Sequence, residues 1–204
     1  MRHITTLVVL GTFIFAGCSS QTVDSSGIPV TEATNPVGPT PVEVAHSQIG
    51  SIIRKLKEQD GAELLRNLQV LVRTRELALE PIAVALPNSD ARTKANLCYV
   101  LGGIGGSRAA QIAMTALSDP DKGVRYEAAS ALATMGDTTG YPVLVGFLAD
   151  PDRRVRYKTI ETLRETTKQD LGFNFNATES EQAAAIGRWK QWLKDVQTQD
   201  LRRK

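Results

Sequence analysis

Three kinds of residue are scarce in this chain, and each scarcity excludes a class of protein. Aromatic residues make up 5% of its 204 residues, which favours helices packed through small side chains over a β-sandwich. Histidine occurs only at His3 and His46, so no histidine-centred triad or zinc site can be assembled. The 24 basic and 22 acidic residues are interleaved, which excludes the one-sided basic surface that nucleic-acid binding needs.

One long apolar run is present, at the N-terminus, and it is too short to span a bilayer. Met1-Arg2-His3 is a short basic start, Ile4 to Phe15 is apolar, and small residues precede Cys18. This order is typical of a secretory signal peptide that is removed from the mature protein. Residues 1–17 are therefore predicted to be a targeting sequence and to take no part in the fold.

Phe15-Ala16-Gly17-Cys18 resembles the lipobox of bacterial lipoproteins, although that family more often has leucine in place of Phe15. The resemblance implies cleavage before Cys18 and acylation of its thiol, for instance with palmitate, which anchors a protein without a transmembrane helix. The alternative is an ordinary signal peptide in which Cys18 is incidental. Residues 18–42 are rich in proline, serine and threonine and are predicted to form a disordered tether. We expect a membrane-anchored lipoprotein of the bacterial cell envelope that faces the periplasm.

A repeat of 31 residues organises the rest of the chain. Asp119-Pro120-Asp121 followed by Val124-Arg125-Tyr126 returns as Asp150-Pro151-Asp152 followed by Val155-Arg156-Tyr157, and a weaker copy begins at Asn88. A fixed period of this length indicates a solenoid, in which each unit buries its core against its neighbours.

Apolar spacing within each unit predicts pairs of helices. Pro81 places the start of one helix near Glu80, and Gly102 to Gly106 are interpreted as the end of another at Leu101. Two sets of leucines in register, which are Leu86, Leu117 and Leu148 and then Leu101, Leu132 and Leu163, are expected to form internal columns. The helices are predicted at residues 42–59, 62–74, 76–86, 90–101, 107–117, 119–135, 140–148, 150–167 and 178–196.

Residues 61–168 resemble HEAT repeats, specifically the short variety also found in phycobilisome-lyase-type proteins. The resemblance implies an all-α fold, a short right-handed α-solenoid over residues 43–170, whose usual role is to hold a protein partner. No active site comes with this fold. Residues 171–204 are predicted to be a C-terminal cap helix and tail, opened by a capping box of Thr178 and Glu181.

The repeated charged residues are interpreted as structural. Asp119, Asp121, Asp150 and Asp152 stand just before helices, where carboxylates accept backbone N–H bonds, so they are read as helix caps and not as paired catalytic acids. Arg125 and Arg156 are expected to pair with an aspartate of the adjacent unit and so to form a ladder; anion binding is the alternative. Cys98 is read as a small buried hydrophobe, against a reactive thiol. No catalytic residue, metal site or cofactor is predicted.

The leading functional hypothesis is a lipid-anchored scaffold without enzymatic activity. It predicts a protein partner on the concave face lined by the second helix of each pair, at exposed residues Gln111, Thr115, Tyr141 and Phe147. Phe175 and Trp192 are candidates for an aromatic contact surface, against simple packing of the cap. The first alternative is an enzyme or chaperone that acts, like a lyase, on a chromophore-bearing or other protein. The second is a purely structural spacer of the envelope.

Overall fold

The computed structural model describes residues 38–203, which contain nine α-helices, three short 3₁₀ turns and no strand. The predicted all-α class is therefore confirmed. The predictions for the signal peptide, for Cys18 and for most of the tether lie outside the described residues. Within the described part, Pro39 onward belongs to one compact unit.

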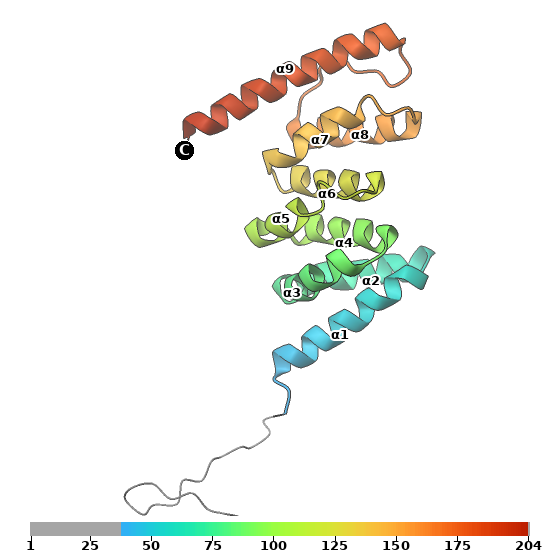
Figure 1. The fold of residues 1–204 in the computed structure, drawn as a ribbon, viewed down its shortest axis with the longest axis vertical. Helices are drawn as coiled ribbons and strands as arrows, with labels where there is room; N and C mark the ends of the chain where they lie inside the picture. The colour runs from blue at the N-terminus through green and yellow to red at the C-terminus, as the bar shows by residue number, and fades with distance from the viewer. Residues whose placement is uncertain (1–37, 204) are drawn as a thin grey trace, which may run out of the picture. The chain divides into compact units, whose positions relative to one another are not determined.

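The helices follow one another in a stack (Figure 1). Short 3₁₀ turns, at Leu56–Glu58, Leu86–Asn88 and Thr138–Gly140 (η3), join some of them. The α-helices are α1 (Pro41–Lys55), α2 (Gly61–Thr74), α3 (Glu76–Ala85), α4 (Ala91–Ile104), α5 (Gly106–Met114), α6 (Lys122–Thr134), α7 (Tyr141–Phe147), α8 (Arg153–Thr167) and α9 (Glu179–Arg203).

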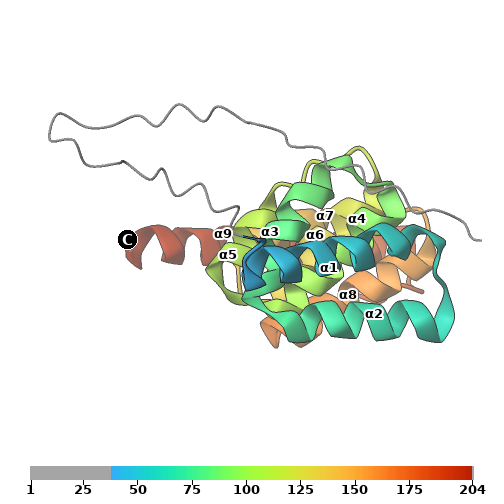
Figure 2. The same ribbon diagram turned by 90° about the horizontal axis from the view of Figure 1, so that it is seen from below.

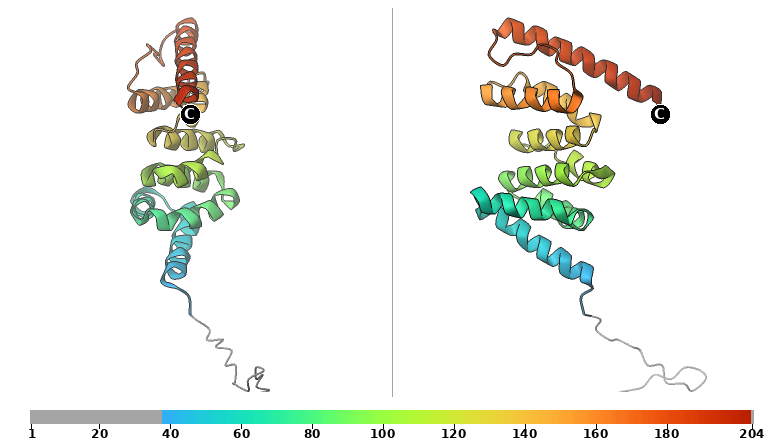
Figure 3. Two further views of the ribbon diagram at one scale, coloured as in Figure 1. Left: turned by 90° about the vertical axis from the view of Figure 1, so that its left-hand side faces the viewer. Right: turned by 180° about the vertical axis from the view of Figure 1, so that it is seen from behind.

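The first helices of successive pairs pack on one another. α4 lies between α2 and α6, and α6 also contacts α8, while the second helices α3 and α5 contact each other. α1 packs against α3 at one end and α9 against α7 at the other, so both end layers are covered (Figures 2 and 3). This arrangement is the stack of helical pairs that the period predicts.

The predicted leucine columns form the centre of the stack. Leu101, Leu132, Leu148 and Leu163 are completely buried, and Leu86 is nearly so. Leu117 is only partly buried, since it stands in the turn after the short helix α5. The buried residues form two clusters, one with Leu86, Leu101 and Leu132 and the other with Leu148 and Leu163, and the partly buried Leu117 packs against both.

The predicted end of α4 at Leu101 is wrong, because the helix continues to Ile104 with Gly102 and Gly103 inside it. A methyl group on Gly103 would lie 2.8 Å from Val72 Cγ2, and one on Gly102 would lie 3.1 Å from Ala131 Cα. These glycines therefore allow α2 and α6 to approach α4 closely. Gly105, with φ of 74°, supplies the conformation that ends the helix.

Several other helix boundaries differ from the prediction. α3 begins at Glu76, the first residue of the predicted range, with Pro81 inside it, so the later start near Glu80 is wrong. The carbonyl that loses its N–H partner to Pro81 belongs to Leu77, a residue 44% exposed, so water can replace the missing bond. α9 runs to Arg203, beyond the predicted end, and begins as predicted after Thr178, whose backbone N–H donates to Glu181 Oε2 at 2.9 Å.

Candidate functional site

The aspartates of the repeated turns are all engaged by backbone groups. Asp121 Oδ1 accepts hydrogen bonds from the N–H groups of Gly123 and Val124, at 2.8 and 3.0 Å. The other three follow the same pattern: Asp119 accepts from Asp121, Asp150 from Asp152, and Asp152 from Arg154. Asp121 and Asp152 are thus the N-caps of α6 and α8, while Asp119 and Asp150 accept from the N–H groups of these two caps and hold the turns before the helices.

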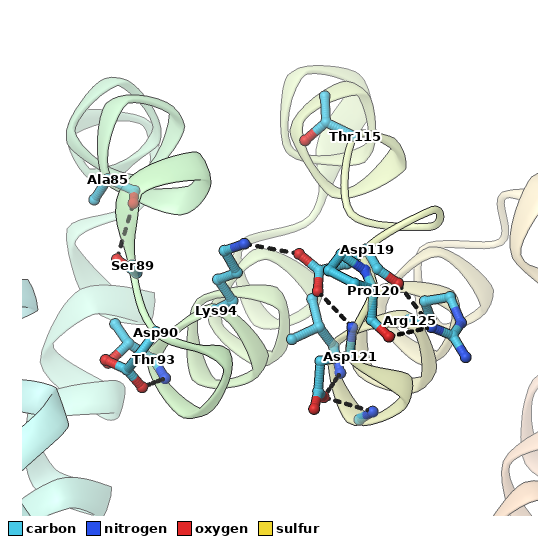
Figure 4. Close-up of polar contacts among 12 residues, drawn as sticks. Ala85, Ser89, Asp90, Thr93, Lys94, Thr115, Asp119, Pro120, Asp121 and Arg125 are labelled. Atoms are coloured by element: carbon cyan, nitrogen blue, oxygen red, sulfur yellow. Dashed lines mark hydrogen bonds and ion pairs between the residues drawn. The ribbon is translucent and has the colours of Figure 1, made fainter.

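The predicted arginine ladder between units is not formed. Arg125 Nη1 donates to the carbonyls of Asp119 and Pro120 at 2.7 and 2.9 Å, within its own unit (Figure 4). Arg156 repeats this geometry with Asp150 and Pro151, at 2.8 and 3.0 Å. Each guanidinium folds back because the turn presents two consecutive carbonyls, which a planar group with several donors can bind together.

Two lysines reach the following unit instead, while Arg92 and Arg108 pair with Asp60 and Glu80 of the preceding unit. Lys94 Nζ lies 2.8 Å from Asp119 Oδ2, and Lys122 Nζ lies 3.2 Å from Asp150 Oδ2. Lys94 occupies the repeat position of Arg125 and reaches forward to the next unit (Figure 4). Its hydrogen bond, together with one from the Asp121 backbone, holds the pKa of Asp119 below its ordinary value.

Only half of the predicted partner surface is exposed. Gln111 and Thr115 are exposed and line a shallow depression on α3 and α5. Tyr141 and Phe147 are only 6% and 8% exposed, so the expectation that they are surface residues is wrong. Tyr141 is covered by Trp192 of α9, at 5.3 Å between ring centroids, and Phe147 packs on Tyr126 at 5.6 Å.

Phe175 and Trp192 make separate aromatic contacts in the described part of the chain. The ring of Phe175 packs on Tyr157 at 4.9 Å, with the guanidinium of Arg153 5.3 Å from its centroid. Trp192 contacts Tyr141 and Trp189. Both side chains are partly buried in the C-terminal core, which corresponds to the packing alternative.

A groove on the opposite layer was not predicted from the sequence. It crosses α2, α4 and α6, has a volume of about 420 Å³, and is called here the first-helix groove. Leu65 and Tyr99, on α2 and α4, are 58% and 57% exposed although both are large and apolar in their main part. Its lining consists of Leu65, Leu68, Gln69, Val72, Arg73, Tyr99, Gly102, Gly103, Glu127, Ser130, Ala131 and Thr134.

Gly102 and Gly103 line this groove, and Ala131 of α6 and Val72 of α2 pack directly against them because they have no side chains. In the next unit the same repeat positions hold Ala133 and Thr134. This difference between units was the signal available in the sequence. From the sequence alone this difference is not informative, because consecutive glycines are also typical of the end of a helix.

Glu127 is the acidic residue of the groove. Its side chain is half-buried, and burial raises the pKa of its carboxyl, while the charge of Lys158 acts in the opposite direction. No described residue donates a hydrogen bond to this carboxylate or lies within ion-pair distance of it. Glu127 is therefore an acceptor that the described part of the fold leaves without a partner.

A second and larger hollow lies between α1, α3 and the start of α4, with a volume of about 650 Å³. Its walls carry charges of both signs, including Arg54, Lys57 and Glu80. Its other carboxylate, Asp90, already accepts a hydrogen bond from the Thr93 N–H at 3.0 Å to cap α4. We interpret this hollow as the seam between the lead-in helix and the first pair.

The repeated part of the chain is similar to a known family. Residues 79–164 match the family model for HEAT repeats. No curated protein matches this sequence. Among solved structures, the chain is similar to human deoxyhypusine hydroxylase in complex with glycerol, with 26% sequence identity and a TM-score of 0.44. The similarity covers 64% of this chain and 47% of that protein, so the chain spans about half of its length.

Residues 38–203 contain no group of three or more histidine, cysteine, aspartate or glutamate side chains placed to hold a metal ion. None of their helices combines the length and the apolar character that crossing a membrane requires. HEAT repeats in general bind proteins, and the first-helix groove carries two large exposed side chains, Leu65 and Tyr99.

Proposed function

We propose that this chain is a lipid-anchored scaffold of the bacterial envelope, without catalytic activity of its own, which holds a protein partner in the first-helix groove. The single observation that carries the proposal is that Leu65 of α2 and Tyr99 of α4 are both exposed and line the same groove. Tyrosine is enriched at protein interfaces, since its ring is apolar and its hydroxyl is polar. Folded proteins rarely leave such groups gathered in a hollow unless something covers them.

The choice of this groove over the second-helix face follows from the burial of Tyr141 and Phe147. Without them, Gln111 and Thr115 remain as exposed polar residues around a depression that offers little apolar area. Their role in partner binding stays a prediction. The groove and the depression lie on different helix layers, so an experiment can separate them.

The proposed anchor is Cys18. The support is the basic start, the short apolar run and the lipobox-like residues before this cysteine. Metabolic labelling with a palmitate analogue is expected to mark the wild type and Cys98→Ala but not Cys18→Ser. Cys98→Ala is the matched control, because alanine stands at the same repeat position in Ala129. Label retained in Cys18→Ser would refute the anchor.

Site-specific photo-crosslinking in living cells tests the partner surface. A photoreactive amino acid replaces Tyr99 in the groove, Gln111 in the depression, or Glu165 on the exposed side of α8. The proposal expects one discrete protein adduct from position 99 and none from position 165. An adduct from position 111 alone would move the partner to the second-helix face, and no adduct from either would contradict a scaffold role.

A further inference from the structure

The partner chemistry of the first-helix groove can be inferred from Glu127. Partial burial of a carboxylate costs free energy, and a hydrogen-bond partner or an opposite charge offsets that cost. Glu127 is half-buried on α6, and none of the residues that the structure describes donates a hydrogen bond to it. Lys158 is close enough to influence it electrostatically but does not form an ion pair with it in the described structure.

The repeat shows that packing does not require a carboxylate here. Asn96 and Lys158 occupy the same position in the preceding and following units. The backbone of a HEAT unit thus accepts an amide, a carboxylate or an ammonium at this place. The acidic side chain of Glu127 is specific to the unit that lines the groove.

The groove is also polarised. Arg73, exposed on α2, lines it on one side of α4, and Glu127 on α6 lines it on the other. Neither forms an ion pair with another described residue. Tyr99, on α4 between them, presents an exposed aromatic ring. The Thr134 hydroxyl already donates to the Ser130 carbonyl at 2.9 Å, so Glu127 is the strong acceptor of the groove.

We infer, resting on the proposed scaffold function, that the partner inserts an apolar segment with one lysine or arginine, whose charged end binds Glu127. Charge-assisted hydrogen bonds to a carboxylate are among the strongest that side chains make. The aliphatic stem of lysine or arginine covers apolar surface, and its cation is attracted to an aromatic face such as that of Tyr99. A segment with an acidic residue at that point would meet a charge of its own sign instead.

Selection of peptides tests this inference. A library of random twelve-residue peptides displayed on phage is selected on the full chain, and the enriched peptides are synthesised. Their affinities are measured for the wild type, Glu127→Gln, Tyr99→Ala and the matched control Glu165→Gln, which removes an exposed charge outside the groove. Thermal unfolding of each variant verifies that it is folded.

The expected result is a consensus of apolar residues around one lysine or arginine, lost from the enriched set when Glu127→Gln is the target. For such a peptide, Glu127→Gln is expected to weaken binding about tenfold, and replacing its basic residue by norleucine should weaken binding to the wild type equally. The two changes together should cost no more than one, and Glu165→Gln should have no effect.

The outcomes separate the two proposals. Peptides that lose affinity in Tyr99→Ala but carry no basic residue, or bind Glu127→Gln as well as the wild type, overturn the inference and leave the groove as a binding surface. Peptides insensitive to Tyr99→Ala, or no enriched peptide at all, overturn both the inference and the assignment of the groove.

Discussion

Two glycines six residues apart in the third helical pair are expected to respond in opposite ways to the same substitution. Gly140, at the end of η3, is buried against α6. A methyl group there would lie 2.4 Å from the carbonyl oxygen of Ala129 and 3.0 Å from Leu132 Cβ. Gly146, in α7, is exposed, and a methyl group on it would have no neighbour within 4 Å.

The magnitude at Gly140 follows from what the methyl group meets. Ordinary contact begins near 3.4 Å, so the added carbon would be about 1 Å too close to an oxygen of the α6 backbone. That oxygen cannot move aside without displacing the helix that carries Glu127. Overpacking of this kind costs about 1–3 kcal/mol. A gain of about 0.5–1 kcal/mol from replacing glycine by alanine offsets part of it.

Gly140→Ala is therefore expected to lower the free energy of unfolding by about 1–2 kcal/mol. Gly146→Ala should raise it by about 0.5–1 kcal/mol, since alanine is the better residue inside a helix. Denaturant unfolding followed by circular dichroism measures both. A Gly140→Ala protein as stable as Gly146→Ala would refute the close approach of η3 to α6.

Three further predictions concern titratable side chains. Burial raises the folded-state pKa of Glu127. The contribution of this side chain to stability is therefore greatest below its unfolded-state pKa and is lost as the pH rises through its folded-state pKa. Glu127→Gln should accordingly raise the melting temperature at neutral pH but not in acid. The Lys94 hydrogen bond lowers the pKa of Asp119, so Lys94→Met should destabilise the protein at neutral pH. The difference in stability between the variant and the wild type should vanish as the pH falls through the folded-state pKa of Asp119, which denaturant titrations repeated across the acid range measure. Burial raises the pKa of Cys98 to about 12, so a thiol reagent at neutral pH should label it only after unfolding, and rapid labelling of the native protein would contradict its place in the core.

The sequence determines those features that depend on contacts within a few residues. The caps of α6, α8 and α9 join an acceptor to an N–H group two or three positions further along the chain, so residue order alone places them. The helical pairs and the leucine columns follow from a period that every unit shares. For this reason the all-α class and most helix positions were predictable.

Contacts between units depended on the tertiary structure. The distance between helix layers and the carbonyls that each turn presents decide whether Lys94 or Arg125 reaches the next unit. Neither the distance nor the position of the carbonyls can be read from the spacing of residues in the sequence. Tyr141 is buried because α9 lies across α7, 51 residues further on at Trp192. The groove has the same origin: Gly102, Glu127 and Leu65 come together only because α2, α4 and α6 stack, and side chains that meet across a stack depend on its geometry and not on their order in the chain.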